Sequence, residues 1–423
     1  MKRLLTAIAV AAITSLPALA QTVAVTNGRV VTNTDGGVLN NGTVIIRDGD
    51  IVAVGTGLDL PQGAEVIDAN GGWITPGLFH PATQLGLIEV GAESSTRDTA
   101  ADESVFNATL RVSDGFNYEG SHIDESRIDG ITRFALYPST GSSILAGRGA
   151  LADSSGEAGS LFADDQFMLI DLSRSGARTA GGSKPAAWAY LRAALNDART
   201  YPGRYMSSQT GIVLNRADAQ AFEAAARGEM PIIFAMDDNA DILRLIAFKE
   251  ENPGLRVVIM GGAEAHTVAQ ELANADIPVI LDPMRNLPDS FDVLSSSMEA
   301  AGLLFDAGVD VAFSTAASDS YFNTRLLTQH AAISVAHGAD WADAFRAITL
   351  TPAEIYGYGD RFGALAPGYA GDLVVWDGDP LEVMSAPTHV FIEGEAQSME
   401  TRQTRLAQRY AEIRSDAEYA YHH

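Results

Sequence analysis

The sequence predicts an α/β protein in which a (β/α)8 barrel of the TIM type is inserted into a small composite β-sandwich. Two observations predict this fold. Short β-branched runs separated by Asn-Gly and Asp-Gly turns occur near both ends of the chain, and between them apolar runs alternate with helical stretches rich in Ala and Leu. Strands that alternate with helices over about 250 residues are typical of a parallel barrel. The composition agrees, because 46% of the residues are hydrophobic and 19% are charged, which excludes disordered and collagen-like classes.

The first twenty residues predict a secretory signal peptide. The basic pair Lys2-Arg3 precedes a short apolar stretch, which ends in the small-residue pattern Ala18-Leu19-Ala20. The stretch is short for a membrane span, and no later segment is long and apolar enough to be one. We therefore expect residues 1–20 to be removed on export. The sequence contains no cysteine for lipid attachment, so we expect release into the periplasm of a Gram-negative cell.

The strands at the two ends of the chain are expected to form one sandwich. Three short strands cannot bury a core alone, so the N-terminal set needs partners. The predicted strands are Thr22–Val25, Thr43–Arg47 and Ile51–Val54 near the N-terminus, and 370–379 and 389–394 near the C-terminus. The sandwich is therefore assigned to residues 21–75 and 366–399.

The barrel is assigned to residues 76–365, and residues 400–423 are assigned to an amphipathic helix and tail. The predicted barrel strands are Trp73–Leu78, Thr132–Tyr137, Ser143–Ala146, Phe167–Leu172, Pro231–Ala235, Arg256–Met260, Pro278–Leu281 and Asp310–Phe313. The predicted helices between them are Pro185–Ala198, Ala217–Arg227, Ala240–Glu250, His266–Ala275 and Met298–Asp306. The first half of the barrel is less regular than the second.

The excess of acidic residues argues against anionic binding partners. Lys and Arg total 28 against 54 Asp and Glu, which gives a formal charge of −26. Such a chain repels nucleic acid and anionic membrane surfaces, so a small-molecule or peptide-like ligand is the expected partner. The absence of cysteine excludes disulfides, thiolate metal sites and cysteine nucleophiles.

Three motifs resemble one known family. Ile74–Leu78 resembles the strand that enters the barrel of imidazolonepropionase-like amidohydrolases, Ala347–Glu354 resembles the helix start after their last barrel strand, and Phe362–Val375 resembles their return into the sandwich. The three occur in the family's order, and the resemblance covers about residues 22–395. It implies hydrolysis of cyclic or other non-peptide C–N (amide) bonds, with one or two divalent metals such as zinc activating a water molecule.

The metal ligands that this resemblance implies are replaced. The family places an acidic residue and His-x-His after strand 1, a carboxylated Lys or Glu on strand 4, single His residues after strands 5 and 6, and Asp after strand 8. Here Ala82 and Gln84 occupy the two histidine positions, Asp171 is the carboxylate near strand 4, and Ala316 occupies the strand 8 position. The segments after strands 5 and 6 contain no histidine. The sequence therefore predicts an eroded metal site and no bound cofactor.

Six residues remain as candidates at the mouth of the predicted barrel: His80, Gln84, Asp171, His266, Asp282 and Thr315. Structural roles stay open for several of them, since His80 fits a turn, His266 the first turn of a helix, and Asp282 a helix cap or a turn. Two hypotheses follow. The chain is either a binding or accessory protein with an eroded metal site, or a hydrolase that uses a relocated single metal or a metal-independent mechanism.

The signal sequence generates a first prediction. Export should remove residues 1–20, because the pattern ending at Ala20 is typical of signal-peptidase cleavage. Mass spectrometry of the protein isolated from its native host should find Gln21 at the mature N-terminus. A protein that begins at Met1 in the native host would contradict the export prediction.

Overall fold

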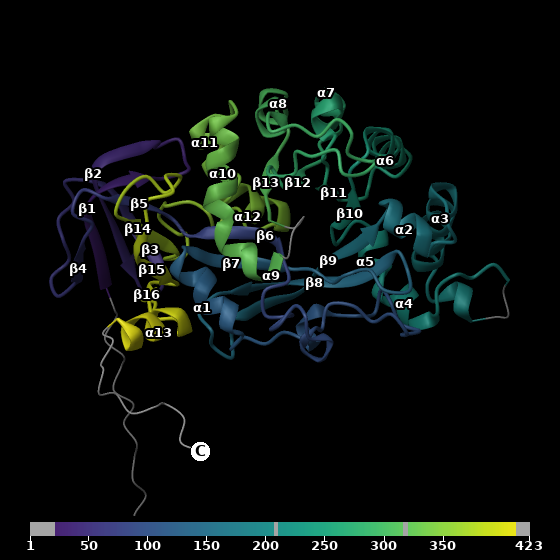
Figure 1. Cartoon of the computed structure of the whole chain (residues 1–423), viewed down its shortest axis with the longest axis horizontal. Helices are drawn as coiled ribbons and strands as arrows, with labels where there is room; N and C mark the ends of the chain where they lie inside the picture. Colours follow the sequence, from purple (N-terminus) through teal and green to yellow (C-terminus); the bar gives the residue numbers. More distant parts are fainter. Residues whose placement is uncertain (1–21, 207–209, 316–319, 412–423) are drawn as a thin grey trace, which may run out of the picture.

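The computed structural model describes residues 22–206, 210–315 and 320–411. The predicted signal peptide therefore lies outside the described residues. Two eight-stranded sheets organise the chain, and Figure 1 shows them side by side, with the strands from both ends of the chain on the left. In the described part of the chain, no helix is long and apolar enough to cross a membrane.

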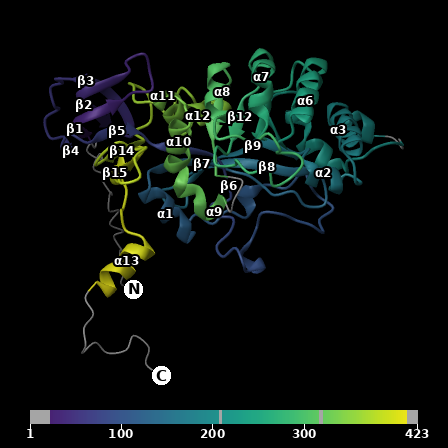
Figure 2. The ribbon, with the colours of Figure 1, turned by 45° about the horizontal axis from the view of Figure 1, so that its top comes forward.

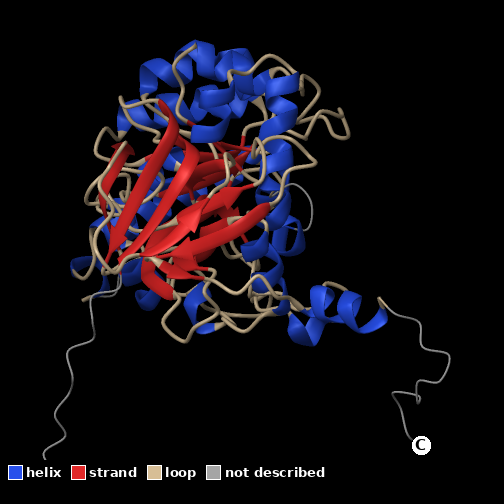
Figure 3. Cartoon of the chain, turned by 90° about the vertical axis from the view of Figure 1, so that its left-hand side faces the viewer, coloured by secondary structure: helices blue, strands red, loops and turns tan. Residues whose placement is uncertain are grey.

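The first sheet combines strands from both ends of the chain, as expected. Its order is β16-β15-β14-β5-β1-β2-β3, and β4 pairs with β1. β5 pairs in parallel with β1 on one side and antiparallel with β14 on the other. It therefore joins the N-terminal strands to the C-terminal strands. Its strands are β1 (Thr22–Val31), β2 (Val38–Arg47), β3 (Asp50–Thr56), β4 (Glu65–Asp68), β5 (Trp73–Pro76), β14 (Leu373–Trp376), β15 (Pro387–Ile392) and β16 (Glu395–Ala396). Figure 3 views the molecule from the side of this sheet.

Local sequence explains the tight turns of this sheet. The β2–β3 hairpin turns at Asp48 and Gly49, whose φ angles are 52° and 88°. A two-residue turn of this kind needs positive φ at both central positions, and Asp-Gly tolerates that conformation. The predicted Asp-Gly turn is therefore present, and it sets the pairing of Arg47 with Asp50.

The second sheet forms the barrel, in the order β13-β12-β11-β10-β9-β8-β7-β6. The strands are β6 (Leu78–Thr83), β7 (Ile131–Leu136), β8 (Leu145–Asp153), β9 (Leu161–Asp171), β10 (Ile232–Met236), β11 (Val257–Gly261), β12 (Val279–Leu281) and β13 (Val311–Phe313). All eight expected strands are present, although the first one divides at Gly77 into β5 of the sandwich and β6 of the barrel.

One strand departs from the predicted parallel barrel. β8 pairs antiparallel with both of its neighbours, and it is longer than the predicted strand Ser143–Ala146. The physical reason is the connection, because only residues 154–160 separate β8 from β9, and a parallel crossover needs a dozen or more. The expectation of an all-parallel barrel was therefore wrong at this strand, which forms a long hairpin with β9 (Figure 1).

Helices cover the outside of the barrel mainly beyond β9. Figure 2 shows α3, α6, α7 and α8 in a row along this side. The helices are α1 (Ser121–Ile128), α2 (Arg174–Thr179), α3 (Lys184–Arg199), α4 (Arg216–Ala221), α5 (Glu223–Ala226), α6 (Asn239–Glu251), α7 (Ala269–Ala275), α8 (Ala300–Asp306), α9 (Ser320–Asn323), α10 (Leu327–Ala336), α11 (Trp341–Arg346), α12 (Leu350–Tyr356) and α13 (Arg402–Tyr410). The helix expected over 217–227 divides into α4 and α5 at Phe222.

The barrel closes without a complete ladder. In the described part of the chain, no strand pairing joins β6 to β13. Backbone atoms of the segment before α12 bridge the gap instead, because Ile348 O accepts from Phe79 N–H and Ala347 O accepts from Phe313 N–H. The predicted motif 347–354 therefore holds the two edges of the sheet together.

The two sheets are locked together by one buried arginine. Arg133 of β7 is 1% exposed and donates two hydrogen bonds to Asp372, at 2.6 and 3.2 Å, immediately before β14. Its guanidinium lies over the Phe362 ring, 4.4 Å from the centroid, and also reaches Glu393 at 3.2 Å. A planar guanidinium suits this bidentate, stacked environment.

The buried pair generates a stability prediction. Asp372→Asn should lower the free energy of unfolding by about 3–5 kcal/mol, because it leaves the buried guanidinium of Arg133 without its main counter-charge. Urea unfolding at pH 7 measures this change. Glu393→Gln is the matched control, since the Glu393 side chain is 57% exposed. This variant should lower the free energy of unfolding by no more than about 1 kcal/mol. Equal losses in the two variants would contradict the assignment of Asp372 as the principal anchor.

Candidate functional site

A cavity of about 300 Å³ lies at the carboxyl ends of the barrel strands. Functional residues of this fold gather at that end, which makes the cavity the candidate site. Its floor is apolar and its walls carry hydroxyls and carboxylates. The residues that line it are Tyr137, Pro138, Ser139, Thr140, Leu169, Asp171, Ser173, Ala235, Met236, Asp237, Met260, Gly261, Ala263, Asp282, Arg285 and Ser314.

Asp171, predicted from the strand 4 position, is one of the three carboxylates in this cavity. It ends β9 and is only 6% exposed. Its Oδ1 accepts from the Ser173 backbone N–H at 2.9 Å, and its Oδ2 accepts from the Thr140 hydroxyl at 3.2 Å. These two bonds fix the carboxylate against the cavity wall.

Asp237 and Arg285 form an ion pair in the same cavity, where Asp237 follows β10, the strand next to β9. Arg285 Nη1 donates to Asp237 Oδ2 at 2.7 Å, and Asp237 Oδ1 accepts from the Ala263 backbone N–H at 3.3 Å. Burial raises the pKa of Asp237, and the nearby guanidinium of Arg285 opposes that shift. Neither residue was among the sequence candidates.

Asp282, also predicted from the sequence, is 7% exposed and caps its own turn. Its Oδ1 accepts from the Met284 backbone N–H at 3.0 Å. The same oxygen lies 3.1 Å from Nδ1 of His330, which α10 contributes. The turn considered for Asp282 is present, no helix begins there, and the side chain also lines the cavity.

His80 and Thr315 lie at the seam of the barrel. Both are fully buried, and neither is among the residues that line the cavity in the described structure. His80 Nε2 lies 3.0 Å from the Thr315 hydroxyl and accepts from the Thr315 backbone N–H at 3.3 Å. Burial, with a smaller contribution from His330, lowers the pKa of His80 to about 3. A neutral His80 that joins β6 to the end of β13 therefore helps to close the barrel where the ladder is missing.

Gln84 and His266 do not join the cavity lining. The Gln84 side chain donates to Ser139 Oγ at 2.6 Å and borders a neighbouring cavity of about 440 Å³. His266 lies in a short 3-10 turn, Ala265–Val268, which leads into α7, and it is half-buried. Burial lowers its pKa, and Glu264 opposes this shift. The helix-turn role considered for His266 matches this position.

The residues at the family's metal positions do not fit a divalent metal. Ala82 has no donor atom, and the Gln84 amide donates its N–H to a serine. Asp237 is committed to Arg285, and the three carboxylates of the cavity come without a histidine beside Asp171 or Asp237. Within residues 22–206, 210–315 and 320–411, no group of three His, Cys, Asp or Glu residues could hold a metal ion. Ala316, at the strand 8 position, lies outside the described residues.

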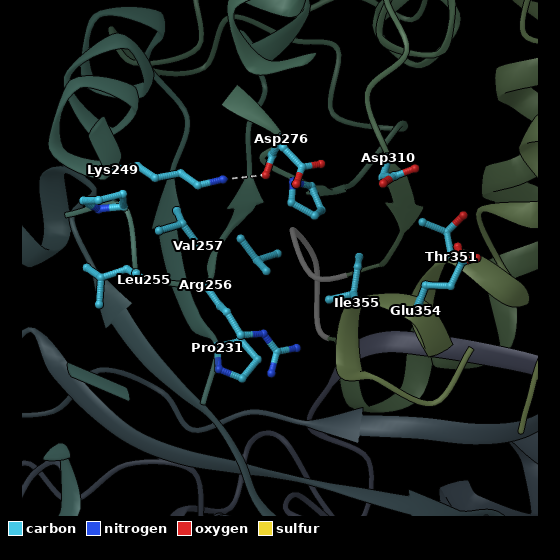
Figure 4. A pocket seen from close by; sticks show the side chains of 14 residues that line it. Pro231, Lys249, Leu255, Arg256, Val257, Asp276, Asp310, Thr351, Glu354 and Ile355 are labelled. Carbon is cyan, nitrogen blue, oxygen red and sulfur yellow. Dashed lines mark hydrogen bonds between the residues drawn. The ribbon is translucent and has the colours of Figure 1, made fainter. Parts of the chain in front are cut away.

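A second depression lies at the opposite, amino-terminal end of the strands. Figure 4 shows its lining side chains, which include Arg256, Asp310 and Glu354. Lys249 points toward the end of α7, where its Nζ donates to the carbonyl oxygens of Ala275 and Asp276. A lysine that caps helix carbonyls is typical of structural stabilisation at this end of the barrel. We therefore assign the functional site to the cavity at the carboxyl ends.

Comparison with known proteins identifies the family. The amidohydrolase family profile matches residues 191–401, from α3 to the end of the sandwich. This chain belongs to the amidohydrolase superfamily. A curated relative, the amidohydrolase tasK of Hapsidospora irregularis, is 34% identical over 98 residues, which span 23% of this chain and 10% of that protein.

Several solved structures share the fold of this superfamily member. An amidohydrolase from Thermotoga maritima superimposes with a TM-score of 0.79 at 23% identity, covering 88% of this chain and 99% of the other. An adenosine deaminase from Xanthomonas campestris with bound zinc gives a TM-score of 0.54 at 17% identity, over 92% and 97% of the two chains. A prolidase in complex with N-methylphosphonate-L-proline gives 0.56 at 16% identity, over 90% and 100%.

One of the two cavity residues that the sequence did not predict carried a recognisable signal. Asp237 directly follows the last residue of β10, which is where side chains enter the mouth of a barrel. The family resemblance implies a histidine after this strand, and an aspartate there was not predicted as a site residue. Arg285 carried no such signal, because it lies in the irregular segment after β12 and reaches Asp237 only in the folded chain.

The buried His80 generates a pH prediction. The folded-state pKa of about 3 lies below the ordinary histidine value of about 6.5, so the unfolded chain binds the extra proton first. Stability is therefore retained above about pH 6.5 and falls as the pH drops toward 3. His80→Gln keeps an acceptor near the Thr315 N–H. When the pH falls from 7 to 4.5, the free energy of unfolding of this variant should decrease by about 2.5 kcal/mol less than that of the wild type. Urea unfolding at both pH values tests this, and parallel losses would contradict a neutral, buried His80.

Proposed function

We propose that this amidohydrolase-superfamily protein is an exported binding or accessory protein that holds a small molecule in its barrel-mouth cavity without the family's binuclear-metal hydrolysis. The observation that carries the proposal is the donor set at the metal positions. Ala82 supplies no ligand, and Gln84 donates to Ser139. The fold and the cavity remain, and the groups that would activate a metal-bound water are replaced.

The chain's own residues suit binding and orientation of a ligand. Hydroxyls of Ser139, Thr140 and Ser173 line the cavity beside Asp171, over an apolar floor that includes Leu169 and Met260. A cavity of about 300 Å³ with a few convergent polar groups is at the small end of the range for small-molecule sites. Export is supported by the signal pattern of residues 1–20 alone.

One observation favours a second candidate, a hydrolase with a relocated metal or none. Asp171, Asp237 and Asp282 line the same cavity. Burial raises the pKa of Asp237, and a carboxyl with a raised pKa is suited to proton transfer. Arg285 holds Asp237 by a 2.7 Å ion pair, however, which limits the proton exchange of this carboxyl.

Metal analysis separates the two candidates. Protein purified without chelator and without a His tag should contain much less than one zinc, manganese or nickel ion per chain. Adding chelator should leave the thermal midpoint unchanged, because a metal bound only to the folded state would stabilise it by mass action. Elemental analysis and a thermal scan measure both quantities.

A bound metal ion together with hydrolytic activity would contradict the binding proposal. About one metal per chain, lost in Asp171→Asn or Asp282→Asn, together with hydrolysis of an amide substrate, would replace the binding proposal with the hydrolase. Asp310→Asn, at the opposite end of the barrel, is the control and should leave the metal content unchanged in either case.

A further inference from the structure

We infer that the barrel-mouth cavity selects small organic cations, such as primary or secondary ammonium compounds, and that Asp171 is the residue that receives the charged group. This inference rests on the proposed binding function and names the ligand class of the same site. It is carried by the charge balance of the cavity wall and by the surroundings of one carboxylate.

The cavity wall carries more negative than positive groups. Its lining contains three carboxylates, those of Asp171, Asp237 and Asp282, and one guanidinium, that of Arg285. Arg285 is committed to Asp237, at 2.7 Å, and extends toward Asp289 at 3.9 Å. The only cation among the described lining residues is therefore already neutralised. An anionic ligand would meet an acidic wall, whereas a cationic ligand would be attracted to it.

Asp171 is a nearly buried carboxylate without a cationic partner. Its side chain is on the cavity wall, the residue is 6% exposed, and among the described residues no Lys, Arg or His nitrogen lies within 4.0 Å of its oxygens. Of the other two carboxylates, Asp237 is paired with Arg285, and Asp282 lies 3.1 Å from the ring Nδ1 of His330. A buried charge is unfavourable unless it is paired, so a ligand cation would supply the missing counter-charge.

The groups around Asp171 complete a receptor for N–H donors. The Thr140 hydroxyl donates its hydrogen bond to Asp171 Oδ2, so the lone pairs of Thr140 Oγ1 stay available as acceptors for an ammonium group. Tyr137 lines the same cavity, and an aromatic ring in a cavity wall is a favourable surrounding for an organic cation. Leu169 and Met260 offer apolar surface for the carbon part of the ligand. A single carboxylate with hydroxyls suits an ammonium group, whereas a divalent metal needs more ligands than this corner provides.

The experiment compares three probes of nearly the same shape. Benzylamine, benzyl alcohol and benzoate are titrated into the full-length mature protein at pH 7, with binding followed by ligand-observed NMR and calorimetry. Benzylamine should bind, and the alcohol and the carboxylate should bind at least about tenfold more weakly, since a hydrogen bond to a charged group contributes more than about 1.4 kcal/mol. Benzylamine binding should also weaken at higher salt.

Two variants and one control assign the effect to Asp171. Asp171→Asn keeps the acceptor for the Ser173 N–H and should weaken benzylamine binding at least about tenfold, with little change for benzyl alcohol. Ala235→Lys places a fixed ammonium on the cavity wall and should abolish benzylamine binding even if the Asn variant is poorly folded. Asp310→Asn, on the opposite end of the barrel, should bind as the wild type does.

The outcomes separate this inference from the function on which it rests. Equal binding of benzyl alcohol and benzylamine, no binding of benzylamine, or unchanged benzylamine binding in Asp171→Asn overturns the cation assignment. None of these results alters the metal content or the hydrolytic activity, which decide the proposed function separately. Stoichiometric metal with hydrolysis would overturn the binding function even if benzylamine binding depended on Asp171.

Discussion

The ion pair between Arg133 and Asp372 is the constraint on which the composite architecture depends. It joins a barrel strand to the residue that leads back into the sandwich, across more than half of the chain, with both groups almost fully buried. A buried pair of this kind is weak evidence of net stability, because desolvation offsets much of the attraction. Arg133 also lies 3.6 Å from Asp153 of its own sheet, so the contacts that tie it to the other sheet are those with Asp372 and Glu393. The contact fixes the barrel strand β7 against the segment that enters the first sheet.

The seam of the barrel is closed by contacts other than a strand ladder. β6 and β13 are joined by the backbone of residues 347–348 and by the contact between His80 and Thr315. A histidine at the mouth of a barrel would ordinarily be examined as a ligand or a base. Burial holds His80 neutral here, and its ring bonds across a gap that lacks a strand ladder. A residue of catalytic type thus acts as a structural link.

The cavity combines a position that is usual for functional sites of this fold with an acidic wall. It lies where the superfamily's fold gathers functional groups, at the carboxyl ends of the strands. The acidic wall is partly neutralised from within by Arg285, which leaves Asp171 as the charge without a protein counter-ion in the described structure. The strong net negative charge of the chain acts in the same direction and favours the approach of cations.

The sequence by itself determined most of the elements and the union of strands from both ends of the chain, and it predicted that the family's metal ligands are replaced. Those features depend on local patterns, such as the Asp48-Gly49 turn, and on the presence or absence of donor atoms, such as that of Ala82. Tertiary structure decided what local patterns do not encode. The short connection after β8 turned that strand antiparallel, and folding brought Arg285 to Asp237 and His80 to Thr315. The reason is physical: long-range contacts depend on the path of the whole chain, whereas strands, turns and caps depend on neighbouring residues.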